Sequence, residues 1–88
     1  MTTTSASTAL TEHIKTRVAA QREAIIGFMR DICAIPSIMG NIGAVGQRVI
    51  DEMNRLGFED TRFDRMGNVL GRLGSGPTVL IYDSHLDT

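Results

Sequence analysis

Apolar residues recur at helical spacing through the first third of the chain. From Leu10 to Ala34 they lie three, four or seven positions apart, at Ile14, Val18, Ile25, Phe28, Met29 and Ile32. This spacing places them on one face of a helix. Thr11 is a candidate N-cap, and Pro36 requires the helix to end by about Ala34 or Ile35, because the residue before a proline avoids helical dihedrals. The pattern therefore predicts one helix over residues 10–34.

A second apolar stripe predicts a helix from about Ile42 to Leu56. Its members are Ile42, Val45, Val49, Met53 and Leu56, and the opposite face carries Gln47, Arg48, Asp51 and Asn54. Gly57 has the position of a C′ glycine, which commonly ends a helix in the left-handed conformation. We expect the stripe to pack in the core and the neighbouring carboxylates, Glu52 and Glu59, to be solvated.

Past Gly57 the pattern shortens to β segments over residues 58–64, 69–73 and 78–82. The stretches Asp64-Arg65-Met66-Gly67-Asn68 and Gly74-Ser75-Gly76-Pro77 have the composition of a turn and a hairpin loop. Val79 to Tyr82 are apolar at consecutive positions, which is typical of a strand covered on both faces. The chain lacks enough residues to cover both, so the sequence predicts an α/β fold of two helices followed by a β-meander, with an incomplete sheet.

Composition excludes several classes of protein. The chain has 88 residues, 42% of them hydrophobic and 22% charged, so we expect one small folded domain. The formal net charge is −1 and the basic residues are scattered, which gives no support for nucleic-acid binding. No apolar run is long enough for a membrane span.

The cysteine count and the first residues bear on the compartment. Cys33 is the single cysteine, which excludes an intrachain disulfide and favours a reducing cytoplasmic compartment. Its apolar neighbours predict that it is buried. Residues 1–9 are rich in Thr, Ser and Ala and lack the basic start and apolar centre of a secretory signal. We interpret them as a disordered leader to a domain that spans residues 10–88.

The strongest candidate for chemistry is the pair His85 and Asp87. In an extended backbone, side chains two positions apart leave on the same side, and a metal-ligating histidine usually needs a carboxylate on its other ring nitrogen. Ligand sites of open α/β sheets lie beyond the carboxyl ends of strands, where this pair follows the third β segment. A solvated hydrogen bond is the simpler alternative. We expect Asp83 and His13 to face solvent, which leaves His85 as the one candidate metal ligand.

Four stretches occur in an order that resembles a known family. They are Ala34-Ile35-Pro36-Ser37, Leu56-Gly57-Phe58, Asp64-Arg65-Met66-Gly67-Asn68-Val69 and Ser84-His85-Leu86-Asp87-Thr88. Together they resemble the amino-terminal segment of the zinc-dependent aminoacylase, acetylornithine deacetylase, succinyl-diaminopimelate desuccinylase and dipeptidase family of metallopeptidases. The resemblance runs from about Glu23 to Thr88. The stretch Met66-Gly67-Asn68-Val69-Leu70-Gly71 is similar to the selenium-metabolism-linked hydrolase branch of that family.

The resemblance implies the N-terminal part of a three-layer catalytic domain that hydrolyses amide bonds of small peptides or N-acyl amino acids. His85 matches the family's first metal-ligating histidine, and Asp87 matches the active-site aspartate that orients it. Family members hold two zinc ions and use a metal-activated water with a glutamate as general base. Cobalt or manganese stays possible, because one histidine cannot select a metal. A homodimer through a lid domain that this chain lacks is also implied.

Two hypotheses follow for function. The family's other metal ligands and its general base correspond to positions beyond Thr88, so we expect the chain to be the beginning of a metal-dependent hydrolase and to be inactive alone. The alternative is a non-catalytic short α/β module that binds a partner through its open strand edge.

Overall fold

The computed structural model describes residues 2–37 and 42–86, and the side chains among them from residue 6 onward. Three helices precede a two-stranded antiparallel sheet. In chain order the elements are α1 (Thr2–Ala20), α2 (Arg22–Ala34), α3 (Gly43–Arg55), β1 (Glu59–Phe63) and β2 (Val69–Arg72). The α/β class predicted from the sequence is confirmed in this coarse form.

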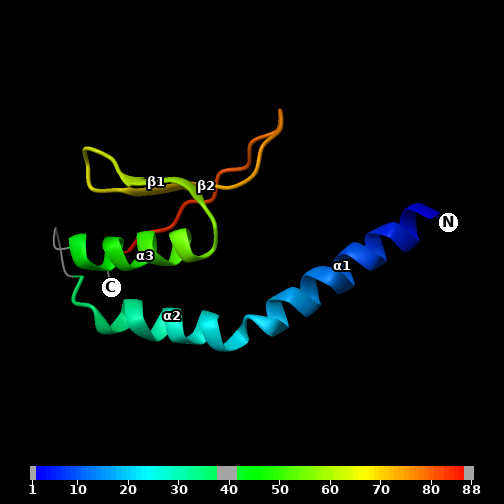
Figure 1. The fold of residues 1–88 in the computed structure, drawn as a ribbon, viewed down its shortest axis with the longest axis horizontal. Coiled ribbons are helices and arrows are strands. Elements are labelled where there is room, and N and C mark those ends of the chain that lie inside the picture. The colour runs from blue at the N-terminus through cyan, green and yellow to red at the C-terminus, as the bar shows by residue number, and fades with distance from the viewer. Residues whose placement is uncertain (1, 38–41, 87–88) are drawn as a thin grey trace.

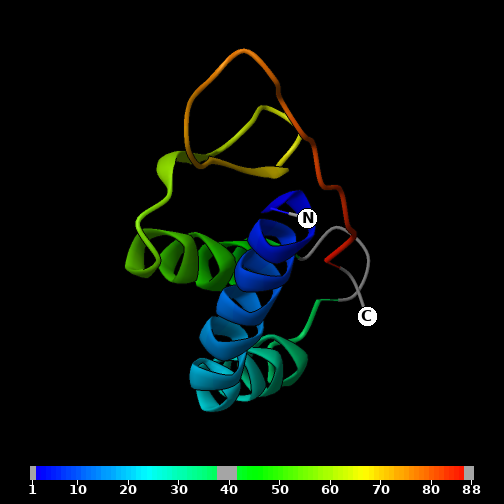
Figure 2. The ribbon, with the colours of Figure 1, turned by 90° about the vertical axis from the view of Figure 1, so that its right-hand side faces the viewer.

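Helix α3 is the central element of the arrangement. Figure 1 shows α2 running alongside it on one side and the β1–β2 hairpin lying on the other. Helix α1 leads into α2 and projects away from the rest of the molecule in Figure 1, and in Figure 2 it points toward the viewer, in front of α2 and α3. The elements therefore stack in the order α2, α3, hairpin, and α1 contacts α2.

The helix expected over residues 10–34 is two helices that meet at Gln21. The Gln21 amide donates to the Val18 carbonyl at 3.0 Å, a bond of i→i−3 type, and its own carbonyl accepts from Ile25 at 2.9 Å. The tighter bond breaks the α-helical ladder at this point. The predicted end at Ala34 is confirmed, because Ile35 before Pro36 is extended, with φ −84° and ψ 123°.

The start of the first helix differs from expectation. Helix α1 begins at Thr2, well before the start near Leu10 that the apolar spacing predicted. The division into a leader over residues 1–9 and a domain over residues 10–88 stays a prediction. No glycine or proline interrupts residues 2–9. The prediction of Thr11 as an N-cap is wrong: it lies inside α1, and its hydroxyl donates to the Ser7 carbonyl at 2.8 Å.

Helix α3 ends as the sequence predicts. Gly57 has φ +87°, its amide donates to the Asn54 carbonyl at 3.2 Å, and the Phe58 amide donates to the Met53 carbonyl at 2.9 Å. These are the two bonds of a Schellman motif. The chain leaves α3 through this motif and enters β1, which places the hairpin back over the helix.

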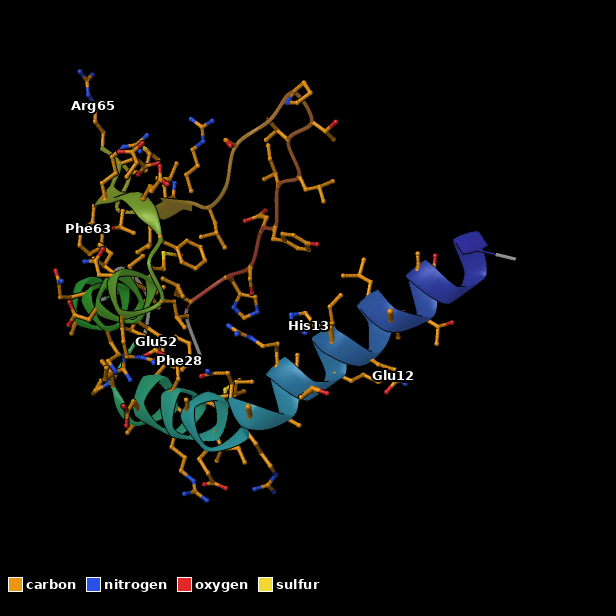
Figure 3. All side chains as sticks on the ribbon, turned by 45° about the vertical axis from the view of Figure 1, so that its right-hand side comes forward. Glu12, His13, Phe28, Glu52, Phe63 and Arg65 are labelled. Carbon is orange, nitrogen blue, oxygen red and sulfur yellow. The ribbon has the colours of Figure 1, made fainter. Side chains whose placement is uncertain are left out.

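The buried face of α3 is rotated from the predicted stripe. Val45 and Ile50 are 1% and 8% exposed and Gly46 is buried, whereas Leu56 is half exposed. Gly46 explains the rotation, because a Cβ there would lie 2.6 Å from Cε1 of Phe63. The missing side chain lets Phe63 and Val69 of the hairpin approach α3 closely at Gly46, and Figure 3 shows Phe63 on this side of the helix.

The predicted hairpin is confirmed for its first two strands. Phe63 pairs with Val69, and a bulge between Glu59 and Arg62 accompanies Asp60 at φ 54°. Asp64 holds the turn together: its Oδ1 accepts from the amides of Met66 and Asn68, both at 2.9 Å, and its Oδ2 accepts from the Asn68 side chain at 3.0 Å. These hydrogen bonds lower the pKa of Asp64, and those from Asn68 have the largest effect.

The third predicted strand does not form among the residues that the structure describes. Residues 73–86 pair with no strand, and Val79, Leu80, Ile81 and Tyr82 are 72%, 76%, 87% and 92% exposed. The prediction of a strand covered on both faces is therefore wrong for this structure, and residues 74–77 form no hairpin loop. A strand needs a neighbour to pair with, and the described residues offer none to this segment.

Two further observations concern exposure. Cys33 is exposed, contrary to prediction, with its Sγ 3.8 Å from Sδ of Met29, and α2 as a whole contains no buried residue. No helix in the described ranges is both long and apolar enough to cross a membrane.

Candidate functional site

The predicted metal ligand lies on the extended segment that follows β2. His85 is exposed there, and Asp83 is exposed as predicted. Asp87 lies outside the described residues, so its orientation toward His85 stays a prediction. Both the assignment of His85 as a ligand and that of Asp87 as its orienting carboxylate stay predictions.

The described side chains do not form a complete metal site. Among the described residues, no group of three or more His, Cys, Asp or Glu lies close enough to hold an ion. His13, the other histidine, is exposed on α1 as predicted. A structural zinc site uses four ligands and a catalytic one three with water. The described residues therefore supply one candidate ligand and do not fit a zinc centre by themselves.

A charged cluster that the sequence analysis missed lies between α2 and α3. Arg48 of α3 donates from Nε and Nη2 to Oδ2 of Asp31 on α2, at 3.1 and 2.9 Å. Its guanidinium carbon lies 5.1 Å from the centre of the Phe28 ring, and its Nη1 donates to Glu52 at 3.0 Å. Figure 3 shows Phe28 and Glu52 close together between the two helices.

Glu52 is the most sheltered charge of this cluster. Its side chain is 12% exposed, and besides Arg48 it accepts two hydrogen bonds from Arg55, one of them from Nε at 3.0 Å. Hydrogen bonds from Arg55, and to a smaller extent from Arg48, lower the pKa of Glu52. Hydrogen bonds to Asp31, and to a smaller extent to Glu52, raise the pKa of Arg48. The expectation that Glu52 is solvated is wrong, whereas Glu59 is exposed as predicted.

The sequence contained a signal for part of this cluster. Arg48, Glu52 and Arg55 lie four and three positions apart, the spacing at which helical side chains meet. The link to Asp31 on α2 had no such signal, because it joins residues 17 positions apart. Only the packing of α2 on α3 brings that carboxylate to Arg48.

His85 does not line either of the two best-formed cavities on the described surface. One of about 380 Å³ lies where the end of α1 and the start of α2 meet the end of α3. Its lining is largely apolar with three charged side chains, from Arg17, Val18, Gln21, Ala24, Ile25, Phe28, Glu52, Arg55 and Leu56. The other, of about 430 Å³, is lined by Ile42, Gly43, Phe63, Met66 and Gly67 and contains no titratable side chain.

The chain is similar to known proteins over about two-thirds of its length. It is 44% identical over 61 residues to the uncharacterized protein YgeY of Escherichia coli strain K12, which covers 69% of this chain and 15% of that protein. It is 39% identical over 60 residues to the LysW-lysine hydrolase of Deinococcus radiodurans, covering 68% and 16% of the two chains. No family model matches the chain, and no solved structure matches it significantly.

The chain spans about 15% of the length of the curated relatives that it matches. The similarity to the lysine hydrolase agrees with the motif order described above. Over the matched stretch, the chain is a partial homologue of these proteins, one of which is named as a hydrolase.

Proposed function

We propose that the chain is part of a metal-dependent hydrolase of amide bonds and that His85 is one of its metal ligands. The observation that carries this proposal is the 39% identity over 60 residues to a protein named as a lysine hydrolase. The substrates that this proposal favours are small peptides and N-acyl amino acids. Zinc is the expected metal, with cobalt or manganese as alternatives.

The described residues have a limited part in that chemistry. His85 offers an exposed imidazole on an extended segment. Asp87, two positions on, would accept a hydrogen bond from the ring nitrogen that faces away from the metal and so fix the tautomer. The remaining ligands and the general base have no counterpart among the described residues. We therefore expect the 88 residues alone to bind zinc weakly and to leave amide bonds intact.

The first test is the intact mass of the protein as its own cells produce it, captured with an antibody against residues 42–57. A species several times heavier than 9.6 kDa supports the hydrolase. Zinc content and amide hydrolysis are then measured on that protein. A species of 9.6 kDa, or stoichiometric zinc binding with turnover by the 88 residues alone, contradicts the proposal.

The chain contains two histidines, which allows a matched test of the ligand. We expect His85→Ala to lower zinc affinity of the native-length protein by at least about tenfold, since a lost ligand should cost no less than a lost outer-shell partner. His13→Ala, on the exposed face of α1, should leave the affinity unchanged. Titration with zinc against a competing chelator measures both. Equal affinities of the two variants would remove His85 from the ligand set.

A second function has one observation in its favour. The exposed apolar segment Val79 to Tyr82 pairs with no strand among the described residues, so its backbone could add to a strand of another chain. A non-catalytic module of this kind would form a defined, cooperatively folded oligomer from the 88 residues alone. Sedimentation of that chain distinguishes the module from a hydrolase segment, which should give an undefined mixture of sizes.

A further inference from the structure

Helix α2 packs on α3 without burying any of its own 13 residues. On the other side of α3, Gly46 is buried and lies against Phe63 and Val69 of the hairpin, although no residue of β1 or β2 is itself buried. The cavity of about 380 Å³ also opens between α2 and the end of α3. Atoms that line a cavity lack partners on one side, so apolar packing holds this end of α2 only weakly on α3.

Arg48 compensates for this loose packing. Among the described residues, both side-chain hydrogen bonds between α2 and α3 come from its guanidinium to Asp31. The same group lies over the Phe28 ring of α2, and Glu52 holds it from the α3 side. The Arg48 side chain is 26% exposed and the Asp31 side chain 55%, so the ion pair lies at the surface. Its two charge-assisted hydrogen bonds and the cation–π contact act together on one side chain.

The other half of the molecule does not depend on α2. The contacts of α3 with β1 and β2 form around Gly46 and Phe63, and the Schellman motif at Gly57 joins the helix to the hairpin. None of these contacts includes a residue of α2. The structure thus consists of a body, α3 with the hairpin, and an arm, α1 with α2.

We propose that Arg48 is a latch that holds the arm on the body, and that its release lets α2 leave α3 while α3 and the hairpin stay folded. Release uncovers the Phe28 ring and the apolar lining of the cavity. The latch is ionic, so salt weakens it, whereas the apolar contacts of the body are less affected. The arm is then a conformational element that opens before the molecule unfolds.

Amide hydrogen exchange of the full chain, resolved by peptide, tests the latch. The informative variant is Arg48→Met, which keeps a long apolar stem and removes the charge. We expect exchange in residues 22–34 to accelerate on the order of tenfold and exchange in residues 43–72 to change less than about twofold. Asp31→Asn removes the partner charge from the other side and should give the same pattern with a smaller change. About 1 M sodium chloride should also accelerate hydrogen exchange in residues 22–34 of the unmodified chain.

Arg30→Met is the control, because Arg30 is an exposed arginine of α2 outside the cluster. It should leave both regions unchanged. The proposal is overturned if residues 22–34 keep their protection in Arg48→Met and Asp31→Asn. It is equally overturned if hydrogen exchange in residues 43–72 accelerates by the same factor as in residues 22–34, since the arm and the body then open as one unit. Absence of protection in residues 22–34 of the unmodified chain would also overturn it.

Discussion

Glu52 shows how one sheltered carboxylate can organise several charges. It receives hydrogen bonds from Arg48 and Arg55 on its own helix, and Arg48 in turn reaches Asp31 across the helix pair. The side chain is 12% exposed, so removing its charge would leave two guanidinium groups without their shared acceptor in a partly dry setting. The residue therefore matters for stability more than its sequence context suggested.

The pKa of Glu52 predicts how stability depends on pH. Arg55 and Arg48 lower this pKa below its ordinary value of 4.5 in the folded chain. Because the pKa of Glu52 is lower in the folded chain, the unfolded chain binds the proton more readily. The ionised carboxylate therefore stabilises the fold fully at a pH above the pKa of Glu52 in the unfolded chain. This stabilisation is lost as the pH falls through the pKa of Glu52 in the folded chain. We expect Glu52→Gln to cost roughly 1 kcal/mol near pH 7 and to flatten this acid-side loss.

Urea unfolding of the two chains at a series of pH values down to about 3 measures this effect. Glu59→Gln is the control, since Glu59 is exposed on β1. Its unfolding free energy should follow that of the unmodified chain at every pH. If the unfolding free energy of Glu52→Gln falls with decreasing pH as steeply as that of the unmodified chain, the Glu52 carboxylate is not coupled to folding.

At the scale of elements, two glycines in helices have opposite roles. Gly46 lies in α3 under the hairpin, where a Cβ would meet Phe63 at 2.6 and 3.1 Å and Val69 at 3.2 Å. Gly27 lies inside α2, where a Cβ would meet nothing within 4 Å. The first glycine permits a close approach between elements, and the second merely weakens its helix.

This difference predicts opposite effects of the same substitution. Gly27→Ala should stabilise the chain by roughly 0.5–1 kcal/mol through helix propensity. Gly46→Ala gains the same propensity but must displace the Phe63 ring, so we expect a net destabilisation of about 1 kcal/mol. Urea unfolding compares the two variants with the unmodified chain. Stabilisation by Gly46→Ala would contradict the close packing of the hairpin on α3.

At the scale of the whole molecule, the notable feature is how much apolar surface is left open. The buried apolar side chains among the described residues are Val45 and Ile50, whereas Val79 to Tyr82 are each more than 70% exposed. A continuous exposed apolar segment usually marks an interaction surface or a site of association. It is the feature that the proposed hydrolase and the alternative module would each have to cover.

The open segment predicts self-association. Ile81→Lys places a charge in its centre, and we expect this variant to shift the chain toward the monomer in a sedimentation series over concentration, with unchanged helical circular dichroism. Met66→Lys changes another apolar residue, 83% exposed at the hairpin turn, and should leave association unchanged. Equal effects of the two variants would indicate that association depends on net charge and not on residues 79–82.

The sequence determined the features that have local causes. Pro36 fixes the end of α2, Gly57 ends α3, and Asp64 with Gly67 closes the hairpin, because each acts on dihedrals or hydrogen bonds within a few residues. The motif order also predicted a relation to hydrolases, and the chain is 39% identical over 60 residues to a protein named as a hydrolase. These inferences needed no knowledge of how the elements pack.

The tertiary structure alone decided which faces meet. It placed the hairpin over Gly46, brought Asp31 to Arg48, and left Cys33 and residues 79–82 exposed against expectation. The physical reason is that burial and long-range ion pairing depend on what lies against a residue, and periodicity says only which residues share a face. A strand pattern likewise becomes a strand only when a partner satisfies its backbone, and the described residues supply no such partner to residues 79–82.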